Sequence, residues 1–81
     1  MQLNPKALGL TLGLLAGGAW LVLMVVSLTT GVLDQTVQTI GGLHPGFSYT
    51  WGGAVWLVGM HLAGGFVGGW VVATVYNKLS A

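Results

Sequence analysis

The sequence lacks cysteine and has almost no charge. Its 81 residues include two Lys or Arg, one Asp or Glu, and no Cys, which excludes disulfide bonds and thiolate metal sites. Only 4% of the residues are charged while 54% are hydrophobic, so the charged outside of a soluble domain cannot be assembled. We therefore expect lipid to be the outer solvent and residues 1–81 to form a single, all-α membrane domain.

The scarcity of charge also limits the possible functions. A net charge of +1 gives no basic patch for phosphate backbones, so we expect no nucleic-acid partner. No nucleophile can be paired with a base and no metal-ligand cluster is present, so an enzyme is the least supported class. Ser27, Thr11 and Thr74 are expected to bond the preceding helical turn instead.

The first long apolar run predicts a transmembrane helix over residues 5–30. No ionisable side chain occurs from Ala7 to Leu28, which is about the length that crosses a hydrocarbon core. Asn4 is the expected N-cap, Pro5 suits the first helical position, and Gly31 is expected to end the helix. A cleaved signal peptide is the rival interpretation, but its apolar core is usually only about 7 to 15 residues long.

A second transmembrane helix is predicted over residues 51–77, where His61 is the only titratable side chain before Tyr76. Lys6 and Lys78 flank the outer ends of the two spans, whereas the connecting segment carries Asp34 and no Lys or Arg. By the positive-inside rule, both termini are expected to be cytoplasmic. Residues 31–50 then form an extracytoplasmic loop.

Within this loop, Leu33, Val37 and Ile40 have the spacing of a short amphipathic helix that lies on the membrane surface. Residues 44–47, His-Pro-Gly-Phe, predict a tight turn with Pro second and Gly third. Aromatic side chains at alternate positions after Gly46 are predicted to anchor this end at the headgroups. They are Phe47, Tyr49 and Trp51.

Glycines recur every four residues in both predicted spans, a pattern that lets two membrane helices approach closely. We expect an antiparallel two-helix transmembrane hairpin with glycine-rich packing, in which Gly13 lies opposite Gly69 and Gly17 opposite Gly65. Glycine is also simply common in membrane helices, which is the alternative explanation. The expected packing residues are Gly9, Gly13, Gly17, Gly64, Gly65, Gly68, Gly69 and Ala73, and the bulky side chains expected to face lipid or another subunit are Trp56, Phe66, Val67 and Trp70.

His61 is the one titratable side chain inside a span, and such residues usually face protein rather than lipid. Its helix position and depth predict that it packs close to Trp20. Three roles are open: a structural hydrogen bond, axial ligation of a haem or chlorophyll-type pigment, and a proton relay, which the lack of acids in the spans disfavours. His44 is expected to be an exposed turn residue, too far from His61 in depth to share a metal.

Three segments together resemble a family of short two-span prokaryotic membrane proteins commonly labelled bacteriophage holin. These are residues 3–10, residues 44–47, and the stretch from Gly64 through Lys78. The resemblance implies a small lesion-forming or pore-associated protein in the prokaryotic cytoplasmic membrane. The chain lacks the acidic residue near Gly64 and the Gly near His61 that the family would have, and it stops soon after Lys78 without a run of charges.

The composition and the family resemblance together leave two candidate functions. The first is a non-catalytic structural or accessory subunit of a larger or oligomeric membrane assembly, whose partners are the lipid bilayer, further copies, or other transmembrane subunits. The second is a holin-like protein that opens holes. A rotor hairpin of a rotary ATP synthase has similar length but needs a carboxylate in its second span, and none is present.

Overall fold

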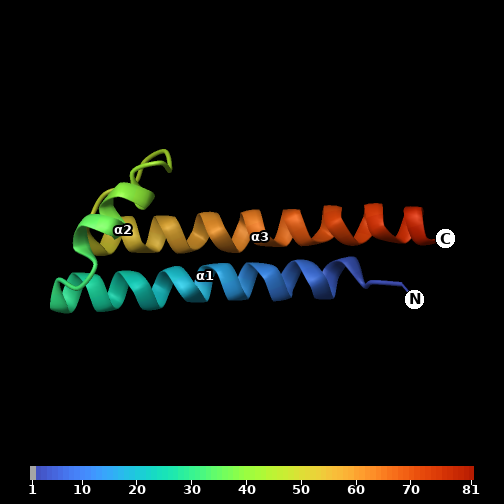
Figure 1. Cartoon of the computed structure of the whole chain (residues 1–81), viewed down its shortest axis with the longest axis horizontal. Helices are drawn as coiled ribbons and strands as arrows, with labels where there is room; N and C mark the ends of the chain where they lie inside the picture. The colour runs from blue at the N-terminus through green and yellow to red at the C-terminus, as the bar shows by residue number, and fades with distance from the viewer. Residues whose placement is uncertain (1) are drawn as a thin grey trace.

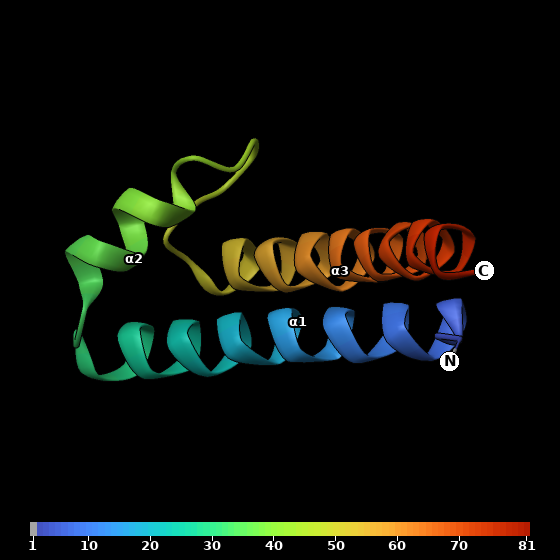
Figure 2. The same cartoon turned by 45° about the vertical axis from the view of Figure 1, so that its right-hand side comes forward.

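The computed structural model describes residues 2–81, and these residues form three helices: α1 (Pro5–Thr30), α2 (Asp34–Gly41) and α3 (Trp51–Ser80). The long helices α1 and α3 run antiparallel and lie side by side, while α2 and the loop after it cover one end (Figures 1 and 2). The described residues measure 48 × 20 × 18 Å. Both chain ends lie together at the end far from α2 (Figure 1).

The helix ends follow from local sequence. The Asn4 side chain accepts a hydrogen bond from the Ala7 N–H (3.1 Å), and Pro5 takes the first helical position. Gly31 ends α1 with a φ of 76°, in the left-handed region where glycine is favoured. Thr50 caps α3, which continues to Ser80 rather than ending at 77.

The short helix α2 begins one residue after Leu33, the first residue of the predicted apolar stripe. Leu33 precedes the helix with a φ of 58°, so it is not part of the helical repeat. Val37 and Ile40 lie within α2, where Val37 is buried and Ile40 is exposed. The predicted stripe is therefore reduced to these two residues.

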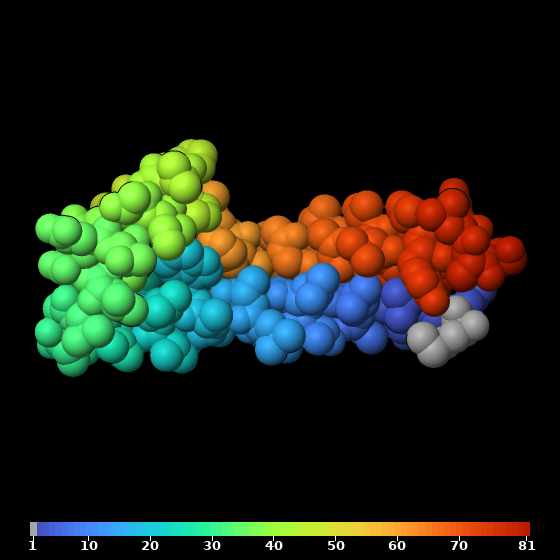
Figure 3. Space-filling model, in the orientation of Figure 1, coloured from blue at the N-terminus to red at the C-terminus, as the bar shows by residue number. Residues whose placement is uncertain are grey.

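Both long helices are long and apolar enough to cross a membrane. Within their most apolar 18-residue windows, only 22% of residues in α1 and 11% in α3 are buried inside the chain. In the space-filling view, α2 and its loop cover one end, and along the rest of the face in view nothing lies over the two long helices (Figure 3). Most of the apolar side chains therefore point away from the chain's own interior.

The two long helices approach most closely at glycine. A Cβ added to Gly69 would lie 2.6 Å from the Cα of Gly9, and one added to Gly65 would lie 2.5 Å from the Cα of Gly13. The helices are therefore displaced by one turn from the predicted register, because α1 overhangs the start of α3 at the loop end. Gly17 meets the Leu62 side chain at 2.7 Å instead of meeting Gly65.

The contact face of α3 is also rotated from the predicted one. Gly64 and Gly68 are exposed, and a Cβ added to either meets nothing within 4 Å. Phe66, predicted to face outward, lies against Gly9, whose added Cβ would be 2.6 Å from the Phe66 carbonyl oxygen. The α3 side of the contact runs through Leu62, Gly65, Phe66, Gly69 and Ala73, with Ala73 fully buried. Trp56, Val67 and Trp70 are exposed, as predicted.

Towards α2, larger side chains fill the space between the helices. The buried cluster there consists of Met24, Val37, Ala54 and Leu57, with Trp20, Leu28, Phe47 and Tyr49 packed against it. This cluster joins all three helices. It holds the loop onto the hairpin, and it thereby sets the surroundings of the two histidines.

At the opposite end, the Asn77 side chain ties α3 to the segment before α1. Its Oδ1 accepts from the Leu3 N–H (2.8 Å), and its Nδ2 donates to the Leu3 carbonyl (2.7 Å). Because both bonds come from one amide, they fix the separation of the two chain ends.

Candidate functional site

The most unusual group of side chains lies where the loop folds back against the long helices. Trp20 comes from α1, His61 from α3, and His44 from the turn after α2. Gly46 has a φ of 79°, and the Phe47 N–H donates to the His44 carbonyl (3.3 Å), which is the predicted Pro-Gly turn. The turn therefore presents His44 to the helices.

The loop is held by side-chain contacts to both long helices and to α2. Trp56 Nε1 donates to the Pro45 carbonyl (2.7 Å), and the hydroxyls of Tyr49 and Ser27 are 2.5 Å apart. The Phe47 ring packs so closely on Gly41 that an added Cβ would lie 2.6 Å from it. Phe47 and Tyr49 are half-buried and thus brace the loop, whereas Trp51 is exposed.

Three rings meet at this point. The centroid of the His61 ring is 5.4 Å from that of Trp20, so the predicted proximity is present. The His44 ring lies 5.0 Å from His61 and 6.0 Å from Trp20. The expectation that the two histidines are far apart in depth was wrong, because the loop after α2 turns back along α3 instead of extending away from it (Figure 2).

Each histidine uses the same ring nitrogen to hold itself in place. His61 Nδ1 is 2.9 Å from the Leu57 carbonyl oxygen, and His44 Nδ1 is 3.1 Å from the Ile40 carbonyl oxygen and 3.2 Å from that of Gly41. A carbonyl can only accept, so Nδ1 is the protonated nitrogen in both rings. In each neutral imidazole, Nε2 then keeps its lone pair.

The chemistry available to this site is ligand binding through nitrogen. Within residues 2–81, no three His, Cys, Asp or Glu side chains come together as a larger metal cluster. Ligation of a flat macrocycle by His61 would require one neighbouring ring to move, because Trp20 and His44 both lie against it. The His61 hydrogen bond goes to Leu57, four residues earlier in α3, and not across the interface to α1 as the structural role considered from sequence requires.

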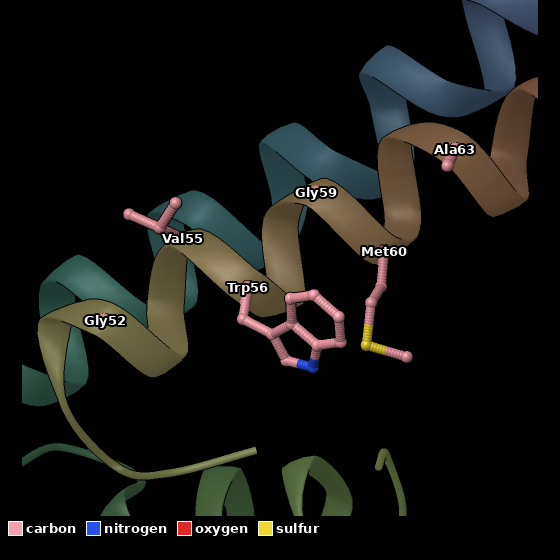
Figure 4. A pocket seen from close by; sticks show the side chains of 6 residues that line it. All are labelled: Gly52, Val55, Trp56, Gly59, Met60 and Ala63. Atoms are coloured by element: carbon pink, nitrogen blue, oxygen red, sulfur yellow. The ribbon is translucent and has the colours of Figure 1, made fainter. Parts of the chain in front are cut away.

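Two apolar hollows lie elsewhere, along the outer side of α3. One has a volume of ≈ 440 Å³, and Figure 4 shows Trp56 and Met60 projecting from the same side of the helix beside it. The second, of ≈ 350 Å³, lies where Leu21 and Val25 of α1 face Val58. The small residues Gly52, Gly59 and Ala63 line the first hollow and give it its depth.

Sequence reasoning missed two polar contacts that hold the site and the hairpin. Tyr49 and Ser27 are 22 positions apart, and nothing in their spacing indicates that they meet. The second contact is that of Asn77 with Leu3, for which a polar amide beside the last apolar turn is the available signal. Thr11 and Thr74 do bond the preceding turn, as predicted.

Comparison with known proteins adds no relative: no family model, no curated protein and no solved structure matches this chain. Its function is therefore argued from its own geometry.

Proposed function

We propose that this chain is a small, non-catalytic integral membrane protein that serves as a structural or accessory subunit, packing against a further transmembrane helix through α3. The observation that carries the proposal is the glycine pair Gly64 and Gly68. These residues are four positions apart on α3, and both are exposed with open space where a side chain would stand. Such spacing is typical of surfaces on which two membrane helices meet.

The cost of these glycines supports the proposal. A glycine in a helix interior is less favourable than alanine by about 1 kcal/mol. At Gly65 and Gly69, close packing of α1 offsets this loss of helix stability. Gly64 and Gly68 make no such contact within this chain. A helix from a second copy or from another subunit would give them the same use.

The outer surface of the chain supports a membrane setting. Few residues of either long helix are buried inside the chain, and the exposed side chains are overwhelmingly apolar. An apolar side chain of a partner could fill the hollow beside Met60. The flexible methionine side chain can adapt to a partner of irregular shape. Lipid and partner helices together would cover this surface.

The charges support one orientation. Lys6 and Lys78 lie at the end that holds both termini, and Asp34 lies at the α2 end (Figure 1). The positive-inside rule then puts both termini of a two-span protein in the cytoplasm. The resemblance found in the sequence makes the prokaryotic cytoplasmic membrane its proposed location.

The test is gentle detergent extraction of the tagged protein, followed by sizing and identification of whatever accompanies it. We expect an assembly larger than one hairpin, and we expect Gly68→Leu to reduce it to single hairpins. Gly18→Leu is the matched control, because Gly18 also faces open space but lies on α1. A single hairpin from the unaltered chain, or equal effects of the two variants, would refute the proposal.

The holin-like alternative predicts a different result in the same cells. Lesion formation requires that expression of the chain alone depolarises the membrane. Under the subunit proposal, membrane potential stays unchanged while the assembly forms. Depolarisation that Gly68→Leu abolishes would favour the holin-like function over a passive subunit.

A further inference from the structure

We propose that His44 and His61 form a two-imidazole binding site for a late first-row divalent metal ion, zinc or copper, whose remaining ligands are water. The site lies within one chain, so it does not depend on the proposed packing of α3. It would pin the loop after α2 to the middle of α3.

The hydrogen bonds of the two rings are the first argument. Histidines that bind metals almost always donate the other ring N–H to a carbonyl, a carboxylate or water, which fixes the tautomer and the ring direction. His44 and His61 both do so, through Nδ1 and main-chain carbonyls of the elements that carry or precede them. Two Nε2 lone pairs remain for a ligand.

The spacing of the rings is the second argument. A tetrahedral ion with metal–nitrogen bonds of about 2.0–2.1 Å places the centroids of two imidazole ligands about 5 Å apart. The centroids of His44 and His61 are 5.0 Å apart, with their planes at 52°. The separation of the two rings therefore equals the one that a shared ion requires.

The surroundings decide which ion fits. Imidazole nitrogen suits zinc, copper and nickel, whereas magnesium and calcium prefer oxygen ligands. Both histidines are half-buried, so the ion can be reached from the exposed turn at Pro45 and Gly46. The Trp20 ring lies beside the histidine pair, with its centroid 5.4 Å from that of His61. Its fluorescence can therefore report metal binding.

The experiment uses the full chain without a histidine tag, in lipid nanodiscs, titrated with Cu²⁺ and separately with Zn²⁺, with Mg²⁺ as the control cation. We expect one Cu²⁺ per chain, with two nitrogen ligands in the electron paramagnetic resonance spectrum, and competition by Zn²⁺. His44→Gln and His61→Gln should each weaken binding by about 10- to 100-fold or more and leave one nitrogen ligand.

Two further measurements separate loss of the site from loss of the fold. Trp20→Phe should keep the copper affinity and show less copper-induced quenching of tryptophan fluorescence, with the remainder coming from the other three tryptophans. Circular dichroism should be unchanged in both histidine variants, and in the unaltered chain the ¹⁵N resonances of both Nε2 atoms should shift with Zn²⁺. Unaltered chain that does not bind Cu²⁺ or Zn²⁺, or a histidine variant that keeps the full affinity and both nitrogen ligands, would overturn the proposal.

Discussion

Adjacent glycines in this chain have opposite surroundings. Gly17 touches Leu62 while Gly18 faces open space, and Gly69 touches Gly9 while Gly68 does not touch α1. Consecutive helical positions are about 100° apart, so the two glycines of a pair face different directions, and in both pairs only one of them meets the other long helix. Each pair therefore offers a matched experiment in which the same substitution is made at neighbouring sites.

Gly69→Leu should separate the long helices. The obstructing atoms are main-chain atoms of Gly9 and Leu8, at 2.6 and 2.7 Å from an added Cβ, and they cannot rotate away. Overpacking of this kind costs about 1–3 kcal/mol, and more when the backbone has to move. Distances between spin labels at Leu14 and Val67 should lengthen in Gly69→Leu and stay unchanged in Gly68→Leu; equal behaviour would contradict the contact face.

Asn77→Ala should loosen the end where the two termini meet. It removes both hydrogen bonds to Leu3, each worth about 0.5–1.5 kcal/mol net, so the free energy of separating the helices should fall by about 1–3 kcal/mol. Steric trapping with a bulky tag on each terminus measures that free energy. Thr74→Ala is the control, because its hydroxyl bonds only within α3, and an equal loss there would argue against the tie.

At the scale of elements, the loop between α2 and α3 is the part of the chain with the densest specific contacts. The Gly53 N–H donates to Thr50, Trp56 holds Pro45, and His44 lies against His61. The start of α3 and the preceding loop therefore form one unit, in which the helix cap and the histidine pair depend on the same backbone path.

Gly53→Ala should disrupt this unit. An added Cβ would collide with the main-chain carbonyl of Ser48, whereas one added to the neighbouring Gly52 meets only Thr50 Oγ1 at 3.8 Å. We expect amide hydrogen exchange across residues 43–50 to become faster in Gly53→Ala. Gly52→Ala should leave it unchanged, and identical exchange in the two variants would show that the loop is not held by this contact.

The elements themselves could be predicted from sequence because their signals are local. Asn4, Pro5 and Gly31 mark the ends of α1, and the Pro-Gly turn is read from two residues. The face of α3 could not be predicted in the same way, since Gly64, Gly65, Gly68 and Gly69 cover a broad arc. Only the neighbouring helix decides which of them is used.

At the scale of the whole molecule, the loop set the register of the hairpin. The sequence places Gly13 and Gly65 in glycine rows, but the overhang of α1 beyond the start of α3 decides that they face each other. The same overhang gives the loop room to fold back, which brings His44 to His61. Tertiary packing, rather than residue spacing, therefore created the histidine pair.

The proposed orientation predicts where single cysteines can be labelled. Because the native sequence has no Cys, a cysteine introduced for Leu79 or for Leu43 is the only thiol, and both positions are highly exposed. In intact cells, a membrane-impermeant thiol reagent should label Leu43→Cys and spare Leu79→Cys. The reverse pattern would invert the topology, and labelling of both would contradict two buried spans.

The central claim is that the Gly64 and Gly68 side of α3 contacts another transmembrane helix. Its most direct test is site-specific photocrosslinking in the native membrane, with the crosslinking residue at Gly68, or at Gly18 as the control in equally open space. We predict a discrete adduct from position 68, with a second copy or another membrane subunit, and none from position 18. Only lipid adducts at position 68, or the same protein adducts at both positions, would contradict the account.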